Sequence, residues 1–238
     1  MEDYGLVSVI LTVYNKPQFL RECIDSVLAQ TYKNWELIAL EDNSPNPEVR
    51  EILESYKDSR IILFYSDISE EDRYKTARYA TLINVGFKIS SGDYITYLTD
   101  DDFFYPHRLE RMVNELQKPG IEAVYGTQQT VDVNGGKGSV RETKGILGPS
   151  TKTEGFNNID HNSVMHTRQV FVDAKGWYDV AGVWGGADAY FWRRVNEAGY
   201  DFYPIDDVPP MDAKRYHETN VQTLIVQGKF FPDGKTPW

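Results

Sequence analysis

The sequence of 238 residues contains little cysteine, little histidine and no long apolar run. Cys23 is its only cysteine, which excludes an intramolecular disulfide and a zinc site built from several thiolates. No stretch approaches the roughly 18–20 apolar residues of a membrane-spanning helix. Residues 1–5 are acidic and polar, unlike the start of a signal peptide. A cytoplasmic protein without a transmembrane segment is expected, with peripheral contact at the inner face of a membrane left open.

Basic residues are also scarce. The 25 Lys and Arg against 36 Asp and Glu give a formal net charge of −11. Because non-specific binding to nucleic acid depends on neutralising phosphates with Lys and Arg, no nucleic-acid partner is expected. The 41% hydrophobic and 26% charged residues are typical of a globular protein rather than a disordered one.

The first 125 or so residues contain a regular alternation of strand and helix signals. Residues 7–13 are almost continuously apolar and β-branched, as in a strand buried on both faces. Pro17 then opens a helix whose apolar residues, Cys23 among them, recur at helical spacing. Further strands are predicted at 35–40, 61–65, 93–99 and 121–127, and helices at 48–56, at 75–89 and from Pro106. This order predicts a mostly parallel α/β sheet with right-handed crossovers.

The pattern changes after this region. Residues 130–142, with Asn134-Gly135-Gly136 at their centre, predict a hairpin. Strands are predicted at 163–166 and 202–205, a helix at 187–198, and a loop-rich tail beyond. Without repeats or a low-complexity linker, residues 1–238 are expected to form one Rossmann-like α/β domain with a mixed-sheet extension.

Three polar clusters follow predicted strands at the point where each strand ends. They are residues 12–16, 41–44 and 99–102. Ligands of open parallel sheets bind outside the carboxyl ends of the strands. We therefore expect the three clusters on one rim of the sheet.

Asp100, Asp101 and Asp102 are the sharpest of these signals. Adjacent carboxylates repel one another, which raises their pKa values unless positive charge is near. Mg²⁺ or Mn²⁺ would supply that charge, typically through one or two carboxylates plus substrate phosphates. The alternative is a solvated acidic turn that caps the following helix.

Two further groups fit a nucleotide. Asp42 and Asn43 could hydrogen-bond a base or ribose, or could form an Asx turn. Arg73, Lys75 and Arg78 are the one basic cluster of this acidic chain and suit a phosphate or a planar base. The alternative is a solvated helix face whose charges pair with neighbouring acids.

Asp188 follows a Gly-Gly-Ala turn and falls in the first turn of a predicted helix. It is either a general base at the mouth of a pocket or a carboxylate that stabilises the helix start. Around it, Trp177, Trp184 and Trp192 either stack on an acceptor sugar or belong to the core.

Three of the histidines are candidates for binding a metal. His161 and His166, five residues apart, would face opposite sides of a strand, so a two-histidine zinc site is not expected. His217 could contact a metal or a phosphate, or could lie on the surface.

Several motifs together resemble a family 2 glycosyltransferase of the GT-A fold, most closely its bacterial spore-coat polysaccharide branch. They are Val-Ser-Val-Ile-Leu-Thr-Val-Tyr-Asn at 7–15, Ile-Asp-Ser-Val-Leu-Ala-Gln-Thr at 24–31, Glu-Asp-Asn-Ser at 41–44 and Gly-Asp-Tyr-Ile-Thr-Tyr-Leu-Thr-Asp-Asp at 92–101. The likeness to the spore-coat branch goes beyond this general pattern and rests on Ser-Asp-Ile-Ser at 66–69, Arg-Tyr at 78–79, Leu-Ile-Asn at 82–84, Asp-His at 160–161, Ser-Val-Met-His at 163–166 and Phe-Trp-Arg at 191–193. It runs from about residue 7 to residue 217.

The resemblance implies roles for individual residues. Thr12 and Tyr14 would line the nucleotide pocket, and Asp42 would read the pyrimidine ring with Arg73 nearby. Asp100 would meet the ribose or a metal-bound water, Asp101 would bind the metal together with Asp100 and His217, and Asp188 would be the catalytic base. Asp160 remains an alternative base. The arginine that many members carry before the fourth strand is missing here, and Arg78 or Arg73 is expected to replace it.

These expectations describe a metal-dependent inverting glycosyltransferase that uses Mn²⁺ or Mg²⁺. A UDP- or dTDP-sugar would be the donor, and a glycan or lipid-linked glycan the acceptor, in polysaccharide or cell-surface glycan synthesis. Residues 1–102 would bind the nucleotide, and residues 103–238 would form the acceptor side and the tail. The tail lacks a Gln-x-x-Arg-Trp signature, which argues against a processive synthase.

Two other functions are compatible with an acidic α/β protein. A non-catalytic nucleotide-sugar or glycan binder would not need Asp101 and Asp188. A sugar-nucleotide pyrophosphorylase would show a Gly-rich basic loop in place of residues 14–17. The sequence makes no prediction of oligomeric state.

Overall fold

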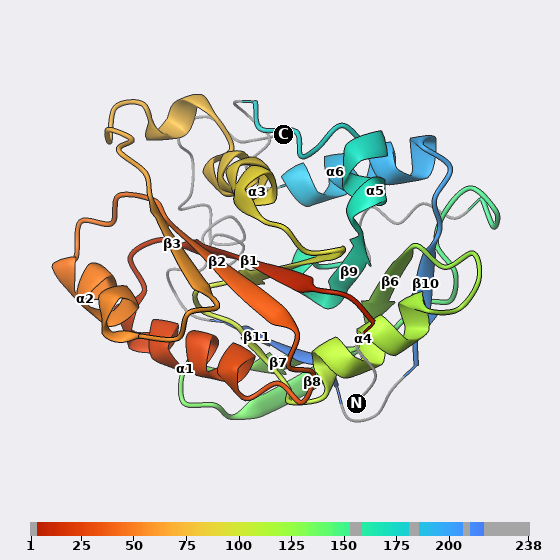
Figure 1. Ribbon diagram of the computed structural model, residues 1–238, viewed down its shortest axis with the longest axis horizontal. Helices are drawn as coiled ribbons and strands as arrows, with labels where there is room; N and C mark the ends of the chain where they lie inside the picture. Colours follow the sequence, from red (N-terminus) through yellow and green to blue (C-terminus); the bar gives the residue numbers. More distant parts are fainter. Residues whose placement is uncertain (1–3, 153–158, 181–185, 207–209, 217–238) are drawn as a thin grey trace.

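The computed structural model describes residues 4–152, 159–180, 186–206 and 210–216. Its centre is a seven-stranded sheet with the spatial order β10–β6–β9–β4–β1–β2–β3 (Figure 1). Neighbouring strands are parallel, except that β9 runs antiparallel to β4 and β6. The strands are β1 (Val7–Val13), β2 (Trp35–Glu41), β3 (Ile61–Tyr65), β4 (Tyr94–Thr99), β6 (Ala123–Gly126), β9 (Val164–Thr167) and β10 (Phe202–Ile205).

Helices cover both faces of this sheet, and each face has its own core. One layer holds α1 (Pro17–Leu28), α2 (Pro47–Ser55) and α4 (Arg108–Leu116); the other holds α3 (Arg78–Ile89), α5 (Arg168–Asp173) and α6 (Ala187–Glu197) (Figure 1). Val9 and Leu11 of β1 belong to the first core, and Ile10 between them belongs to the second. Residues 7–13 are apolar without alternation because the strand is covered on both sides.

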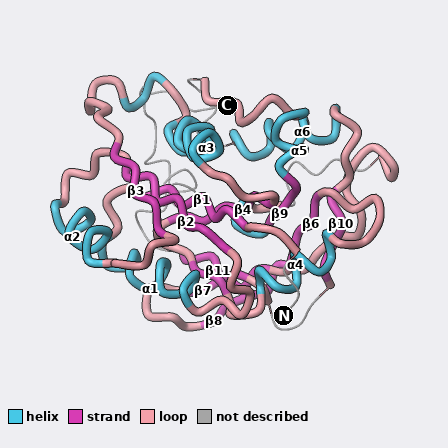
Figure 2. The backbone as a smooth tube through the Cα atoms, in the orientation of Figure 1, coloured by secondary structure: helices cyan, strands magenta, loops and turns pink. Residues whose placement is uncertain are grey.

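A second sheet of four strands, in the order β5–β11–β7–β8, lies on the side of the large sheet that α1 and α4 cover (Figure 2). Its strands are β5 (Phe103–Phe104), β7 (Gln128–Val131), β8 (Lys137–Arg141) and β11 (Asp212–Arg215). The antiparallel pair β7–β8 confirms the predicted hairpin. β11 runs parallel to β7 and antiparallel to β5.

The prediction of a loop-rich tail is wrong for residues 212–215. All four residues of β11 are buried, yet Asp-Ala-Lys-Arg has neither the apolar alternation nor the β-branched side chains of an ordinary strand. Ion pairs and hydrogen bonds, rather than apolar contacts, accommodate this strand.

Other boundaries differ by a few residues. The helix predicted from Lys75 begins at Arg78, because Arg73–Lys75 forms a separate 3₁₀ turn, η1, and Thr76 is extended. The strand predicted at 121–127 is reduced to β6, and the helix predicted from Pro106 begins at Arg108. The short helix α5 was not predicted. No helix within the described ranges is long and apolar enough to cross a membrane.

Arg108 joins the two sheets from a position that is 1% exposed. Its Nη2 donates to Thr96 Oγ1 of β4 at 2.8 Å and to the carbonyl of Val164 in β9 at 3.2 Å. Its Nε lies 3.9 Å from Asp212 Oδ2 of β11, and Gln128 donates to the other oxygen of Asp212 at 2.7 Å. Burial raises the pKa of Asp212 to about 6, and Arg108 opposes that rise.

We predict that Arg108→Met lowers the free energy of unfolding by about 3–5 kcal/mol, because Asp212 is left buried without its cation. Urea denaturation measures the loss. Arg50→Met is the matched control: this arginine pairs with Glu54 on an exposed helix face, and the change should cost about 0.5 kcal/mol or less. Asp212→Asn in the Arg108→Met background should recover part of the loss. Equal effects for the two arginines would contradict this role.

Candidate active site

The three polar clusters predicted at strand ends do lie on one rim. β1 is flanked by β2 and β4, and Thr12 is level with Leu40 and Thr99 across the sheet. Because β9 runs the opposite way, its start lies at the same rim. The segment from Asp160 through the 3₁₀ turn η2 (His161–Ser163) is thereby added to the site.

Asp100 and Asp101 share one cation that belongs to the chain. The ammonium of Lys16 lies 3.1 Å from Asp100 Oδ1 and 3.0 Å from Asp101 Oδ2. The other oxygen of Asp100 accepts from the backbone N–H of Tyr14 at 2.7 Å. Burial raises the pKa of Asp100 to about 6, and Lys16 limits that rise. Both carboxylates are almost fully buried, so the alternative of a solvated acidic turn is wrong.

Asp102 points to different partners. It accepts from Thr99 Oγ1 at 2.8 Å, from the backbone N–H of Arg215 at 2.6 Å and from the side-chain amide of Asn162. Burial raises its pKa to about 8, and the charge of Asp101 adds to the rise. The three aspartates are thus one pair at the rim and one carboxylate that attaches β11 and η2 to β4.

The residues at the rim fit a divalent metal only in combination with a ligand. A positive charge, the Lys16 ammonium, already lies between Asp100 and Asp101, so this position accommodates a cation. Within the described residues, no group of three or more His, Cys, Asp or Glu side chains could hold a metal ion. Mg²⁺ commonly takes one or two carboxylates and completes its shell with phosphates and water. The sequence argument overlooked Lys16 as a source of positive charge.

Two arginines converge on Asp42, which is 2% exposed. Arg73 Nη1 donates to Oδ2 at 2.6 Å, and Arg78 Nε donates to both oxygens at 3.2 Å. The guanidinium of Arg73 also lies 3.9 Å above the centre of the Tyr14 ring. Lys75 does not join this group: its exposed ammonium pairs with Asp72. Asp42 therefore holds both guanidinium groups, and that of Arg73 lies over Tyr14, just beyond the end of β1.

Asp188 lies in the first turn of α6. One of its oxygens accepts from the backbone N–H of Ala189 at 2.8 Å. The neighbouring N–H of Ala187 donates to the hydroxyl of Tyr79, whose ring stacks on His161 at 5.9 Å between centroids. Burial raises the pKa of Asp188 to about 6, and the charge of Asp160 adds to the rise. A carboxylate with such a pKa can accept a proton near neutral pH.

Other predicted candidates belong to the interior. Trp177 and Trp192 are buried, with ring centroids 5.6 Å apart, which assigns them to the core. His166 is also buried, and its Nε2 lies 2.6 Å from the hydroxyl of Tyr97. Cys23 is buried as expected. Trp184 and His217 lie outside the described residues.

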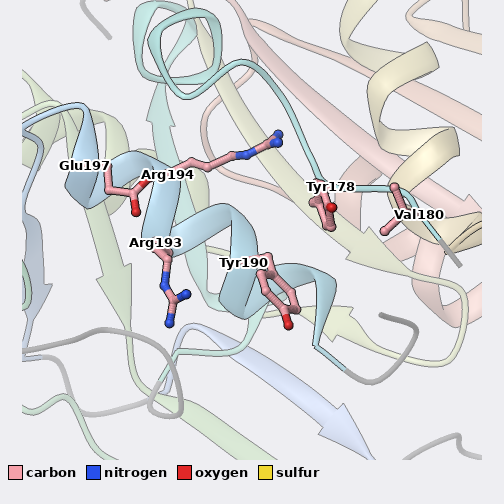
Figure 3. A pocket seen from close by; sticks show the side chains of 6 residues that line it. All are labelled: Tyr178, Val180, Tyr190, Arg193, Arg194 and Glu197. Carbon is pink, nitrogen blue, oxygen red and sulfur yellow. The ribbon is translucent and has the colours of Figure 1, made fainter. Parts of the chain in front are cut away.

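A hollow of about 440 Å³ lies on α6 but apart from this rim (Figure 3). Positions 188 and 197 are nine residues apart, or two and a half helical turns, so Asp188 and Glu197 lie on opposite sides of α6. The hollow is therefore separate from the rim that carries Asp188. Its lining residues are Tyr178, Val180, Tyr190, Arg193, Arg194 and Glu197.

Sequence reasoning missed several residues at the site. Lys16 was noted only as part of a polar cluster, and Lys214 only as part of a tail. The basic side chain of Lys16, just beyond a strand end, was a signal that could have been used. Tyr79 was noted only within the Arg-Tyr pair that resembles the spore-coat branch, and Asn162 gave no signal of its own.

Comparison with known proteins agrees with this geometry. The chain is 40% identical over 213 residues to Protein CgeD of Bacillus subtilis, covering 85% of this chain and 48% of CgeD. It is 35% identical over 134 residues to the UDP-Glc:alpha-D-GlcNAc-diphosphoundecaprenol beta-1,3-glucosyltransferase WfgD of Escherichia coli, covering 56% of this chain and 49% of WfgD. The chain thus spans about half the length of these two relatives.

Among solved structures, S. aureus TarS 1-349 in complex with UDP-GlcNAc superposes with a TM-score of 0.70 at 12% identity, covering 90% of this chain and 59% of the TarS 1-349 chain. The GT-A fold expected from the motifs is confirmed by this likeness. The model of Glycosyl transferase family 2 matches residues 8–194. The chain therefore belongs to glycosyl transferase family 2.

Proposed function

We propose that this chain transfers a sugar from a pyrimidine nucleotide diphosphate sugar to a hydroxyl group of a glycan, with inversion at the anomeric carbon. The observation that carries the proposal is that one rim holds two kinds of carboxylate. Asp100 and Asp101 share the Lys16 ammonium, whereas Asp188, in the first turn of α6, forms no ion pair with the described residues and has a pKa raised to about 6. The first kind suits a diphosphate leaving group, and the second suits an attacking hydroxyl.

The nucleotide would lie along the ends of β1 and β2. Thr12 and Tyr14 would line its pocket, and Asp42, held by Arg73 and Arg78, would face the pyrimidine. The stacking of Arg73 on Tyr14 supports this placement, because guanidinium and phenol planes both suit a flat base. The names of WfgD and of the TarS complex both include UDP, which favours uracil among the pyrimidines.

Mn²⁺ or Mg²⁺ would be held by Asp101, with Asp100 beside it and the donor phosphates completing its shell. When bound, the metal would offset the charge that develops on the departing diphosphate. His217, the third metal ligand that the resemblance implies, lies outside the described residues.

Asp188 would accept the proton of the attacking hydroxyl. The acceptor oxygen forms a bond to the anomeric carbon, and the bond from that carbon to the phosphate oxygen breaks. Attack on the face opposite the leaving group gives inversion. Alignment of these three atoms in a shaped pocket can contribute about 7–11 kcal/mol in favourable cases.

The acceptor would be a glycan or a lipid-linked glycan, handled in the cytoplasm or at the inner face of the membrane. The printed name of WfgD, which includes a diphosphoundecaprenol-linked sugar, supports an acceptor of this class.

A thermal-shift screen of nucleoside diphosphates and their sugars, with and without Mn²⁺, tests the proposal. A ligand at 100 times its Kd stabilises the folded state by about 2.7 kcal/mol. For a chain of this size that corresponds to roughly 5–10 °C in melting temperature. We expect UDP or dTDP with Mn²⁺ to give this shift, and ADP and GDP to give less.

Slow release of sugar from the stabilising donor would distinguish an enzyme from a non-catalytic binder on the same fold. No shift with any pyrimidine diphosphate would refute the proposal.

A further inference from the structure

Asp160 and Asp188 are both carboxylates of the acceptor side, but they differ in what they contact. Asp160 Oδ2 lies 2.6 Å from the ammonium of Lys214, and both side chains are less than 10% exposed. Its Oδ1 accepts from the backbone N–H of Asn162 at 3.1 Å. Both oxygens of Asp160 are therefore engaged in holding structure together.

Within the described residues, Asp188 accepts a hydrogen bond at one oxygen only. Its Oδ1 accepts from Ala189, and among the described residues no side chain donates to either oxygen. The residue is only partly buried, so the carboxylate can meet a ligand. Among the contacts of the described residues, Asp188 keeps an oxygen for an incoming hydroxyl and Asp160 does not.

The position of Lys214 is fixed by the sheet rather than by its own side chain. β11 is held between β5 and β7, and Asp212 at its start is anchored by Gln128 and Arg108. On the other side of Lys214, the backbone N–H of Arg215 donates to Asp102. The chain is thereby anchored on both sides of Lys214, whose ammonium lies 2.6 Å from Asp160 Oδ2 and 3.9 Å from Asp102 Oδ2.

The neighbouring charges also affect the pKa values of Asp160 and Asp188 differently. Burial acts to raise the pKa of Asp160, but the positive groups around it, Lys214 foremost, together hold the pKa below its ordinary value. Burial also raises the pKa of Asp188 to about 6; Asp160 adds to this rise, and Lys214 opposes it.

Asp102, just after β4, lies 3.9 Å from the Lys214 ammonium and is a second carboxylate beside it. Further titratable groups come from three other elements. Tyr79 of α3 faces Asp188, His161 of η2 adjoins Asp160, and Arg141 of β8 acts on Asp160 from a greater distance. Burial raises the pKa of Tyr79 and lowers that of His161 to about 4, so both are neutral near pH 7. Lys214 is then the cation that contacts Asp160 directly.

We propose that Lys214 is a positioning residue that commits Asp160 to a structural ion pair and so reserves the role of base for Asp188. This inference rests on the proposed function. It gives β11, which carries Lys214, a role at the site. It also identifies Asp188, rather than Asp160, as the carboxylate that receives the proton.

The test is the pH dependence of sugar release from UDP-glucose and UDP-N-acetylglucosamine with Mn²⁺, in the full chain and its variants. A base must be ionised, so the wild-type rate should rise with pH through about 6. Lys214→Met removes the opposing cation and should move this midpoint up by about one unit. Asp160→Asn removes the neighbouring negative charge, should retain activity, and should move the midpoint down. Lys214→Arg should keep the wild-type profile.

A purely structural role for Lys214 would lower the rate without moving the midpoint, and an unmoved midpoint overturns the inference. So does a loss of activity in Asp160→Asn as large as in Asp188→Asn, because Asp160 would then be the base.

If Lys214→Met does not fold, the double variant Lys214→Met/Asp160→Asn restores charge balance. Its midpoint should lie within about half a unit of wild type, and a larger displacement overturns the inference. The proposed function fails separately, if the wild type itself releases no sugar from either donor.

Discussion

Replacing Asp188 with asparagine is expected to leave nucleotide affinity within about twofold and to lower sugar transfer by about 10²–10⁴-fold, the usual contribution of a general base. Asparagine has nearly the same shape and can still accept from Ala189, so the first turn of α6 should be preserved. It cannot take a proton from a hydroxyl group. Calorimetry with UDP and a transfer or hydrolysis assay measure the two quantities separately.

Glu197→Gln is the matched control for this variant. It makes the same change of carboxylate to amide in the same helix, but on the opposite side of α6, where Glu197 lines the separate hollow (Figure 3). Its rate should equal that of the wild type. A wild-type rate for Asp188→Asn, or an equal loss in Glu197→Gln, would remove Asp188 from the role of base.

The alternation of elements made the large sheet predictable. Residues 7–13 have no polar face because helices cover β1 on both sides, and this burial leaves a direct trace in the sequence. Strand ends marked by polar clusters then placed Asp42 and Asp100 on one rim, since parallel strands end on the same side. The local sequence pattern and the parallel topology were therefore sufficient to predict the large sheet and its rim.

The second sheet was less predictable, because β11 is stabilised by partners far away in the sequence. Asp212 depends on Arg108 and Gln128, and Lys214 depends on Asp160. A buried charge is stable only when its partner is present, and no local window of sequence shows a partner 50 or 100 residues away. The polar sequence Asp-Ala-Lys-Arg of β11 was therefore predicted to lie in a loop.

The same limit applied to the aspartate triplet. The sequence spacing does not distinguish the three carboxylates from one another, and it predicted a metal ion as their source of positive charge. The structure separates Asp102 from the other two and adds Lys16 between them. Which of three adjacent side chains faces a ligand depends on backbone direction beyond the strand end, and the residue types do not encode that direction.

This separation gives a prediction about the metal. We expect UDP to bind the wild type at least about tenfold more tightly with Mn²⁺ than without it, a difference of about 1.4 kcal/mol. Asp101→Asn should remove this dependence, because it takes away one of the two charged carboxylates now paired with Lys16. The affinity for UDP without metal should change little. Calorimetric titrations at fixed pH and salt, with Mn²⁺ or with EDTA, measure all four affinities.

Asp102→Asn is the control, and it makes the test specific to position rather than to total charge. Asp102 is bound by Thr99, Asn162 and Arg215 and does not contact Lys16, so it has no place in the shared cation position. Because burial raises its pKa to about 8, it is largely uncharged near pH 7, and asparagine there changes the charge of the rim little. Asp102→Asn should therefore keep the tenfold effect of Mn²⁺, provided that its melting curve shows a folded protein.

If both variants lost the effect equally, the metal would be responding to the acidity of the whole triplet, and the assignment to Asp101 would be wrong. If neither lost it, the cation would be bound elsewhere, and the Lys16 ammonium would be the only positive charge that Asp101 needs.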